Sequence, residues 1–162
     1  MADRKSVLLG GPIQHAIDGD GVFDGRFKNL ILCLVEILEE AGYRVFSAHL
    51  AEDFGDLTPA ENSAGIVTRD HGWMQCCDVY VAVFPRNGGE FIRSDGTHVE
   101  IGWASALGKP IVLVGDGIPS KENSHLVRGL GAITRVQFVP IKDVEGDPRS
   151  LLTEIQKAVG GM

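Results

Sequence analysis

The sequence predicts an α/β protein with a flavodoxin-like five-stranded parallel sheet and helices on both faces. Three observations predict it. The chain of 162 residues suits a single domain (1–162) with a substantial core. Five short apolar runs are spaced along it, and segments of helical periodicity or helix signals separate them. Strands that alternate with helices imply a parallel sheet covered on both faces, with right-handed crossovers.

The first quarter of the chain predicts a strand, a helix and a second strand. The strand, residues 6–10 (SVLLG), is an apolar run that Gly-Gly-Pro ends. Apolar residues then recur at helical spacing over 27–41, and Gly42 is a natural stop for that helix. Residues 43–49 (YRVFSAH) are predicted as the second strand.

The middle of the chain repeats the pattern. Residues 58–61 (TPAE) form a capping box with proline at the first helical position, so a helix is predicted to begin there and extend toward Gln75. Residues 78–84 (DVYVAVF) are the third predicted strand. A loop over 85–96 follows, and it leads into a helix that Gly108 ends.

The last part of the chain completes the sheet. The fourth strand is predicted at 111–114 (IVLV) and the fifth at 135–139 (RVQFV), with a short helix at about 122–130 between them. The segment 147–159 is predicted as a closing helix with Asp147 as its N-cap.

The expected strand order is 2-1-3-4-5, which places a ligand site at the carboxyl ends of strands 1 and 3. This rule selects the segments that follow the first four strands: GGPIQHA (10–16), SAHLAEDFG (47–55), FPRNGGEFIRSDGTHVE (84–100) and GDGIPSKENSHLVRG (115–129).

Charge and composition exclude several classes of function. The net charge is −7 and no basic block is present, which argues against a nucleic-acid partner. The apolar run near the N-terminus is too short for a signal peptide or a membrane span, so we expect a cytoplasmic protein with no membrane partner.

The cysteines and histidines predict neither a disulfide framework nor a metal site. Cys33, Cys76 and Cys77 are odd in number and lie in apolar stretches, as core thiols do. No His-x-x-x-His or His/Cys cluster occurs, so we expect no metal and no cofactor. His49 and His98 lie near the predicted cleft, as candidate substrate-binding residues.

Two glycine-containing segments are candidates for binding an anion. Gly10 and Gly11 form either a tight turn or a ligand platform at the end of strand 1. Ser94 and Gly96 stand at a helix start, where unpaired N–H groups and the helix dipole favour an anion. Simple capping by a side chain at this helix start is the alternative, and both can hold together.

Glu100 and Asp70 are the candidate catalytic pair. Glu100 lies near the start of an otherwise apolar helix, and Asp70 lies on the preceding helix. Paired carboxylates in one cleft are typical of glycosyl chemistry, where one attacks the sugar and the other manages the leaving group. Each is also explained as a solvated helix residue, and the helix start is expected to keep Glu100 ionised.

Four stretches together resemble the nucleoside 2-deoxyribosyltransferase superfamily: LGGPIQ, AH at 48–49, RDHGWMQCCDVYVAVF and SDGTHVEIGWASALGKPIVLV. They are most similar to its hydrolytic branch, the nucleoside 5′-monophosphate N-glycosidases. That branch includes the CMP hydrolases of nucleoside-antibiotic pathways and the 2′-deoxynucleoside 5′-phosphate N-hydrolases.

The resemblance implies roles for individual residues. Glu100 matches the nucleophile that holds the ribosyl group covalently, and Asp70 matches the acid near the leaving base. Ser94 and Gly96 match positions that hold the 5′-phosphate. Ser124 matches a residue that reaches the phosphate from the neighbouring subunit, which implies a homodimer with shared sites.

The base pocket is where the sequence departs from the CMP hydrolases. Gly11 and Ile13 match the turn that lines this pocket, but Ile13-Gln14 stands where those enzymes have Phe-Arg. Gln14 can hydrogen-bond cytosine through its amide, which both donates and accepts, and it can equally serve a purine. The base therefore stays open.

Three readings of the function follow. The first is a hydrolase that takes a small-molecule nucleotide, CMP or a related pyrimidine, to free base and (deoxy)ribose 5-phosphate. The second is a 2-deoxyribosyltransferase that exchanges bases. The third is a nucleotide-binding module in which Glu100 is only structural.

Overall fold

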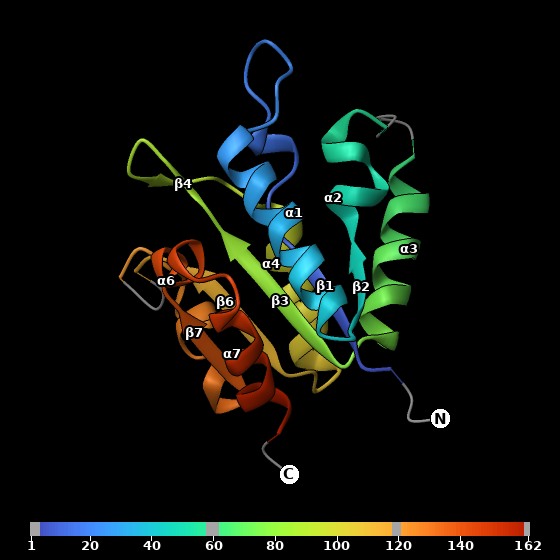
Figure 1. The fold of residues 1–162 in the computed structure, drawn as a ribbon, viewed down its shortest axis with the longest axis vertical. Coiled ribbons are helices and arrows are strands. Elements are labelled where there is room, and N and C mark those ends of the chain that lie inside the picture. The colour runs from blue at the N-terminus through green and yellow to red at the C-terminus, as the bar shows by residue number, and fades with distance from the viewer. Residues whose placement is uncertain (1–3, 58–61, 118–120, 161–162) are drawn as a thin grey trace.

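The structure is a computed structural model that describes residues 4–57, 62–117 and 121–160. Its centre is a sheet of five parallel strands, drawn in Figure 1 with their carboxyl ends toward the top. In spatial order the strands are β2 (Arg44–Ser47), β1 (Ser6–Gly10), β3 (Val79–Phe84), β6 (Ile111–Gly115) and β7 (Val136–Val139). The predicted order 2-1-3-4-5 and the flavodoxin-like fold class are thereby confirmed.

Helices cover both faces of this sheet, and the alternating side chains of the strands divide the core into two clusters. One cluster packs under α1 (Gly25–Glu40), α6 (Ile141–Gly146) and α7 (Ser150–Val159), which lie in front of the sheet in Figure 1. The other packs under α3 (Ser63–Cys76), α4 (Asp95–Ala106) and the short α5 (His125–Arg128). Every residue of β1, β3 and β6 is buried, which explains their continuous apolar sequences.

The second predicted strand is too long. β2 ends at Ser47, and Ala48–Ala51 form a short helix, α2, that carries His49. Alanine and leucine favour a helix there, and α2 leads into a 3₁₀ turn, η2 (Asp53–Gly55). The predicted capping box at 58–61 lies outside the described residues, and α3 is described from Ser63 onward.

The predicted loop at 85–96 contains a small hairpin, so that expectation is corrected. Its strands are β4 (Arg86–Asn87) and β5 (Glu90–Phe91), which pair antiparallel. Gly88 and Gly89 between them have φ of 59° and 88°, the left-handed conformation of a two-residue hairpin turn. The Asn-Gly-Gly sequence carries this signal, but strands of two residues give no apolar periodicity.

The C-terminal part also differs from the prediction. The helix predicted at about 122–130 is reduced to α5 and a 3₁₀ turn, η3 (Leu130–Ala132). α6 was not predicted. Asp147 follows α6, and its Oδ1 accepts from Arg149 N over 3.2 Å just before α7, as expected of a residue that caps this helix. α6 is too short for its buried pair, Ile141 and Val144, to stand out as a helical repeat.

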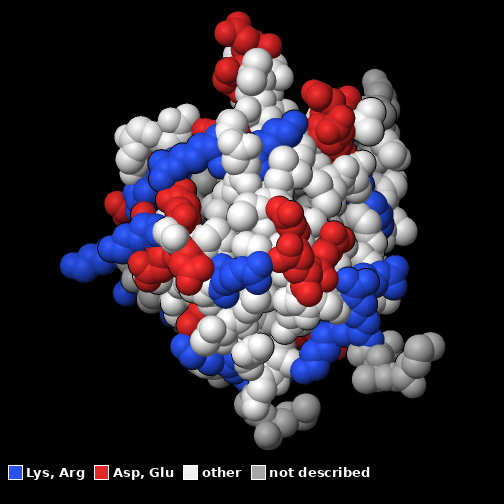
Figure 2. All heavy atoms as spheres, viewed as in Figure 1, with Lys and Arg blue, Asp and Glu red and all other residues white. Residues whose placement is uncertain are grey.

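Acidic and basic side chains are interspersed on the face seen in Figure 2, without a continuous basic surface there. Among the residues that the structure describes, no helix combines the length and the apolarity needed to cross a lipid bilayer.

Candidate active site

A cleft with a volume of about 170 Å³ opens at the carboxyl ends of β1 and β3. It brings together residues from the turn after β1, from α3 and from the start of α4, which is the switch point expected of this strand order. The predicted site residues that line it are Gly11, Ile13, Gln14, Asp70, Ser94, Gly96 and Glu100.

Glu100 lies in the second turn of α4 and is held by a tyrosine from the sheet. The hydroxyl of Tyr80, on β3, donates a hydrogen bond of 2.5 Å to Glu100 Oε2. Tyr80 is fully buried, and burial together with the charge of Glu100 raises its pKa well above the usual range. The phenol therefore stays protonated and orients the carboxylate.

Gly10 is required by its closeness to this pair. A Cβ atom built on Gly10 would lie 2.6 Å from the Tyr80 hydroxyl and 2.7 Å from Glu100 Oε2. A Cβ on Gly11 would lie 2.9 Å from both the Phe27 ring and the Val83 carbonyl oxygen. These glycines let the chain pass beside the carboxylate, so close packing accounts for them.

Burial raises the pKa of Glu100 to about 7. The hydrogen bond from Tyr80 lowers this pKa, and the negative charge of Asp70 raises it further. The expectation that the helix start keeps Glu100 ionised is therefore corrected, because burial outweighs the dipole at this position. Near neutral pH the carboxyl group exchanges between its two protonation states.

Asp70 also lines the cleft and belongs to an ionic chain. Arg69 Nε donates to Asp70 Oδ1 over 2.8 Å, and Arg69 Nη2 donates to Glu52 Oε1 over 2.5 Å. The guanidinium also lies over the ring of Trp73, 4.8 Å from its centroid. Burial raises the pKa of Asp70, although the hydrogen bond from Arg69 opposes the shift. Sequence reasoning found Asp70 and missed Arg69 and Glu52.

The start of α4 forms the other end of the cleft. Ser94 is the N-cap, and its buried side chain accepts from Thr97 N over 3.3 Å and shares a hydrogen bond with the Thr97 hydroxyl. Capping by Ser94 is thereby confirmed. Arg93 also lines the cleft and pairs with Asp95 through bonds of 2.9 and 2.8 Å. The helix start thus offers backbone N–H groups to an anion, beside an arginine that is already paired with Asp95.

His49 does not line the cleft, contrary to the expectation for it. It is fully buried, and its Nε2 lies 3.0 Å from the Pro12 carbonyl oxygen, to which it donates. The rings of Phe23, Phe27 and Phe54 surround it, and burial lowers its pKa to about 4. The neutral imidazole supports the glycine-proline turn from behind and has no direct route to a ligand in the cleft.

His98 and Ser124 also lie outside the cleft of their own chain. His98 Nδ1 is 2.6 Å from the Ser94 carbonyl oxygen, and its ring borders a neighbouring hollow of about 180 Å³. Ser124 is the exposed N-cap of α5, where its hydroxyl oxygen accepts from Val127 N over 3.3 Å. The structure therefore brings neither side chain to Glu100 within one subunit.

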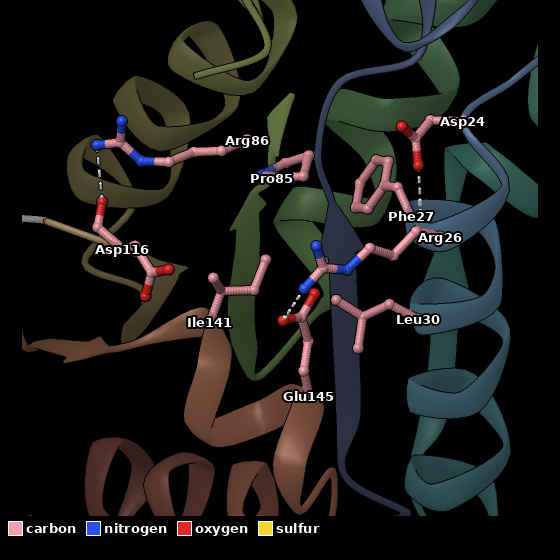
Figure 3. Close-up of a pocket in the computed structure, with 9 residues that line it drawn as sticks. All are labelled: Asp24, Arg26, Phe27, Leu30, Pro85, Arg86, Asp116, Ile141 and Glu145. Carbon is pink, nitrogen blue, oxygen red and sulfur yellow. Dashed lines mark hydrogen bonds and ion pairs between the residues drawn. The ribbon is translucent and has the colours of Figure 1, made fainter. Parts of the chain in front are cut away.

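A smaller hollow of about 70 Å³ lies between α1, α6 and the end of β3 (Figure 3). Both of its arginines are engaged: Arg26 pairs with Glu145 over 2.7 Å, and Arg86 donates to the Asp116 carbonyl over 3.2 Å. None of the predicted site residues lines it, so the cleft lined by Glu100 and Asp70 is the candidate active site.

Among the residues that the structure describes, no group of three or more His, Cys, Asp or Glu side chains is arranged to hold a metal ion. The cleft offers two carboxylates with raised pKa values, which suits acid–base and covalent chemistry.

Comparison with known proteins gives a consistent result. Residues 19–129 match the family model of nucleoside 2-deoxyribosyltransferases. BlsM, known from a solution structure, is 33% identical, and the match covers 100% of this chain and 98% of BlsM with a TM-score of 0.73. The CMP N-glycosidase BcmB of Clostridium botulinum is 26% identical over 92% of this chain and 99% of its own, with a TM-score of 0.59.

A 2-deoxyribosyltransferase from Bacillus psychrosaccharolyticus shares the fold. It is 20% identical over 91% of this chain and 95% of its own, with a TM-score of 0.54. No curated protein sequence matches the chain.

Proposed function

The chain belongs to the nucleoside 2-deoxyribosyltransferase family, and within that family we propose that it hydrolyses the N-glycosidic bond of a nucleoside 5′-monophosphate. One observation carries the proposal: the carboxyl groups of Glu100 and Asp70 face one cleft, whose far end is the N-terminus of α4. A nucleoside monophosphate has three matching parts. Its sugar would lie at Glu100, its base at Asp70 and its phosphate at the N-terminus of α4.

Glu100 is the nucleophile in this proposal. Its Oε2 is engaged by Tyr80, so Oε1 attacks the anomeric carbon as the bond to the base breaks. Water then attacks the same carbon, releases the sugar phosphate and regenerates the carboxylate. Asp70 gives a proton to the departing base and takes one back from that water.

The phosphate is proposed to bind at Ser94 and Gly96. Backbone N–H groups at a helix start hold an anion without a basic surface, which fits a protein with a net charge of −7. A transferase that acts on unphosphorylated nucleosides does not need this site, so it favours the hydrolase over base exchange, which is the second candidate.

The base is proposed to be cytosine or a related pyrimidine. BcmB is described as a CMP N-glycosidase and matches nearly the whole chain, which supports this choice. Ile13 and Gln14 line the cleft, so the Gln14 amide is available to the base edge. The substrate belongs to the cytoplasmic nucleotide pool, and we propose that compartment for the enzyme.

The active unit is proposed to be a homodimer in which Ser124 completes the phosphate site of the partner subunit. Val67 on α3 and Val99 on α4 are about half exposed. Each lies one helical turn before a residue of the contact between these helices, in which the rings of His71 and Trp103 are 5.2 Å apart. Leu126, beside Ser124, is 84% exposed. These apolar side chains suit burial against a second copy.

Base release from a panel of nucleoside 5′-monophosphates and the matching free nucleosides tests the function. The hydrolase predicts release from a cytosine or related pyrimidine monophosphate, with ribose 5-phosphate or its deoxy form as the second product. Adding a second free base separates the candidates, because a transferase yields a new nucleoside and a hydrolase does not. If no member of the panel loses its base, the proposed function is wrong.

A further inference from the structure

The ionic chain Glu52–Arg69–Asp70 is more elaborate than the proposed reaction requires. Its side chains are mostly shielded from water, with exposed fractions of 8% for Glu52, 26% for Arg69 and 11% for Asp70. Glu52 and Asp70 both line the cleft. A lone Asp70 would suffice to accompany the leaving base, so the second carboxylate needs an explanation.

Arg69 is divided between the two acids. An arginine that serves one carboxylate commonly donates two parallel hydrogen bonds to it. Here only Nε reaches Asp70, because Nη2 is directed to Glu52. The Trp73 ring under the guanidinium restricts the plane in which this fork lies.

The backbone holds Glu52 in place at some conformational cost. Glu52 follows α2 directly, and the next two residues, Asp53 and Phe54, have φ of 44° and 54°. Non-glycine residues rarely adopt this left-handed conformation, and it persists where the surroundings enforce it. The ring of Phe54 packs against Phe23 and His49, which anchors the turn. The fold thus fixes the Glu52 carboxylate beside Arg69.

We propose that Glu52 is a positioning residue that acts through Arg69 and keeps Asp70 able to carry a proton. It draws one end of the guanidinium away from Asp70 and balances the positive charge. This inference rests on the proposed function, because a proton on Asp70 matters where a base must leave. The proton passes from Asp70 to the base as the bond to the anomeric carbon breaks, and the attacking water later returns one to Asp70.

The charges around Asp70 agree with this role. The groups that act on it are Arg69 from its own helix, Glu52 from the end of α2, Tyr80 from β3 and Glu100 from α4. Burial raises the pKa of Asp70, Arg69 lowers it, and the charge of Glu52 raises it. When Glu52 and Arg69 are both ionised, their opposite charges cancel. The three side chains together then carry no net charge as long as Asp70 is protonated.

The sign of the effect can be tested with two variants that shift Asp70 in opposite directions. Glu52→Gln leaves Arg69 unbalanced, so the pKa of Asp70 falls and the alkaline limb of the kcat/KM profile moves to lower pH. Arg69→Gln removes the positive charge, so that limb moves to higher pH. Glu145→Gln is the control. It breaks the Arg26–Glu145 ion pair outside the cleft, so the kcat/KM profile should stay the same as that of the wild type.

The leaving group provides a second readout that a merely structural role would not change. With a nucleoside monophosphate at alkaline pH, Glu52→Gln should lose about tenfold or more in kcat, since general acid catalysis typically contributes about 10²–10⁴. With 4-nitrophenyl ribofuranoside 5-phosphate, whose leaving group needs no proton, the loss should be less than about twofold. Equal losses on both substrates would overturn the proposal.

A titration without substrate keeps the inference separate from the proposed function. The carboxyl carbon of Asp70 can be followed by NMR in protein labelled at aspartate, with Asp70→Asn to assign its signal. It should titrate at lower pH in Glu52→Gln than in the wild type. An unchanged midpoint would overturn the role of Glu52 even if the enzyme is an active hydrolase. Should Glu52→Gln fail to fold, Glu52→Asp, whose shorter side chain withdraws the carboxylate from Arg69, should move the midpoint in the same direction, and an unchanged midpoint would again overturn the role of Glu52.

Discussion

At the scale of single residues, the demands on Glu100 conflict. Attack on a sugar requires the ionised carboxylate, whereas burial favours the neutral acid and raises the pKa to about 7. Tyr80 offsets part of the burial cost by donating a hydrogen bond to the charged form. In the proposed reaction, Glu100 is therefore a nucleophile that ionises near neutral pH.

Replacing Glu100 should abolish the reaction and preserve the fold. Glu100→Ala removes the covalent nucleophile, which we expect to lower kcat by several orders of magnitude. Steady-state base release measures the loss, and circular dichroism checks the fold. Glu36→Ala, an exposed replacement on α1, serves as the control with full activity. Retention of more than about a tenth of the turnover, a loss below about 1.4 kcal/mol, would contradict the role.

The raised pKa of Glu100 also predicts a cost in stability that depends on pH. The folded-state pKa of about 7 lies above the ordinary glutamate value of 4.5. The free energy of unfolding is therefore highest below about pH 4.5 and falls as the pH rises through 7. Glu100→Gln removes this titration. We expect the variant to be more stable than the wild type at pH 8 by up to about 3 kcal/mol, following 1.36 kcal/mol per unit. Urea unfolding at pH 4.5 and pH 8 measures it, and an equal difference at both pH values would contradict it.

Gly10 provides a test of the geometry around Glu100. In Gly10→Ala the new methyl group would overlap the Tyr80 hydroxyl and Glu100 Oε2, so these side chains must separate. We expect kcat to fall at least about tenfold, because small displacements of a reacting group are costly. Gly19→Ala is the matched control, since a Cβ there meets no atom within 4 Å. Equal kinetics of the two variants would show that the Tyr80–Glu100 pair is not needed.

The sequence predicted some of these residues and missed others for a physical reason. Glu100, Ser94 and Gly96 belong to one contiguous helix start, whose signals are local. Tyr80 and Glu52 gain their roles from contacts between elements far apart in sequence, as in the hydrogen bond across 20 residues from Tyr80 to Glu100. Neither contact leaves a periodic or local pattern that can be recognised in one sequence.

At the scale of elements, α4 combines two tasks. Its N-terminus, capped by Ser94, lines the cleft with the positive end of the helix dipole, and its second turn presents Glu100. A helix is rigid over one turn, about 5.4 Å, so in the proposed complex it would hold the phosphate and the anomeric carbon at a fixed separation. The same segment would then determine both phosphate binding and nucleophilic attack.

Ser94 allows the phosphate role of this helix to be tested. Ser94→Ala should raise KM for the monophosphate far more than for the free nucleoside, because a hydrogen bond to a charged group is worth about 1.5–3 kcal/mol. The lost N-cap should also cost about 1 kcal/mol of stability. Ser105→Ala, which removes a hydroxyl that bonds within the same helix, is the control. An equal change in KM for both substrates would remove Ser94 from the phosphate site.

Prediction at the element scale succeeded where apolar periodicity was strong. The three central strands and α1 were identified because their buried residues are continuous or regularly spaced. The hairpin β4–β5, α2 and α6 were missed, since elements of two to six residues contain too few buried positions to define a period.

At the scale of the whole molecule, the parallel sheet determines where the chemistry lies. The turn after β1 and the segment from β3 to α4 meet at one edge because these strands are neighbours in the sheet. Within one subunit this edge lacks Ser124, which lies at the start of α5 outside the cleft. In the proposed homodimer, Ser124 of one subunit would reach the phosphate bound in the other.

Mixing two inactive variants tests whether the sites are shared. Glu100→Ala lacks the nucleophile. Ser124→Asp keeps an N-cap for α5 but places a negative charge against the phosphate. In a C₂ dimer each Ser124 would serve the other subunit, so a mixed dimer has one site with both defects and one with neither. Equal mixtures should recover about a quarter of the wild-type sites by random pairing. No recovery, although mass spectrometry proves subunit exchange, would show that Ser124 acts within its own chain.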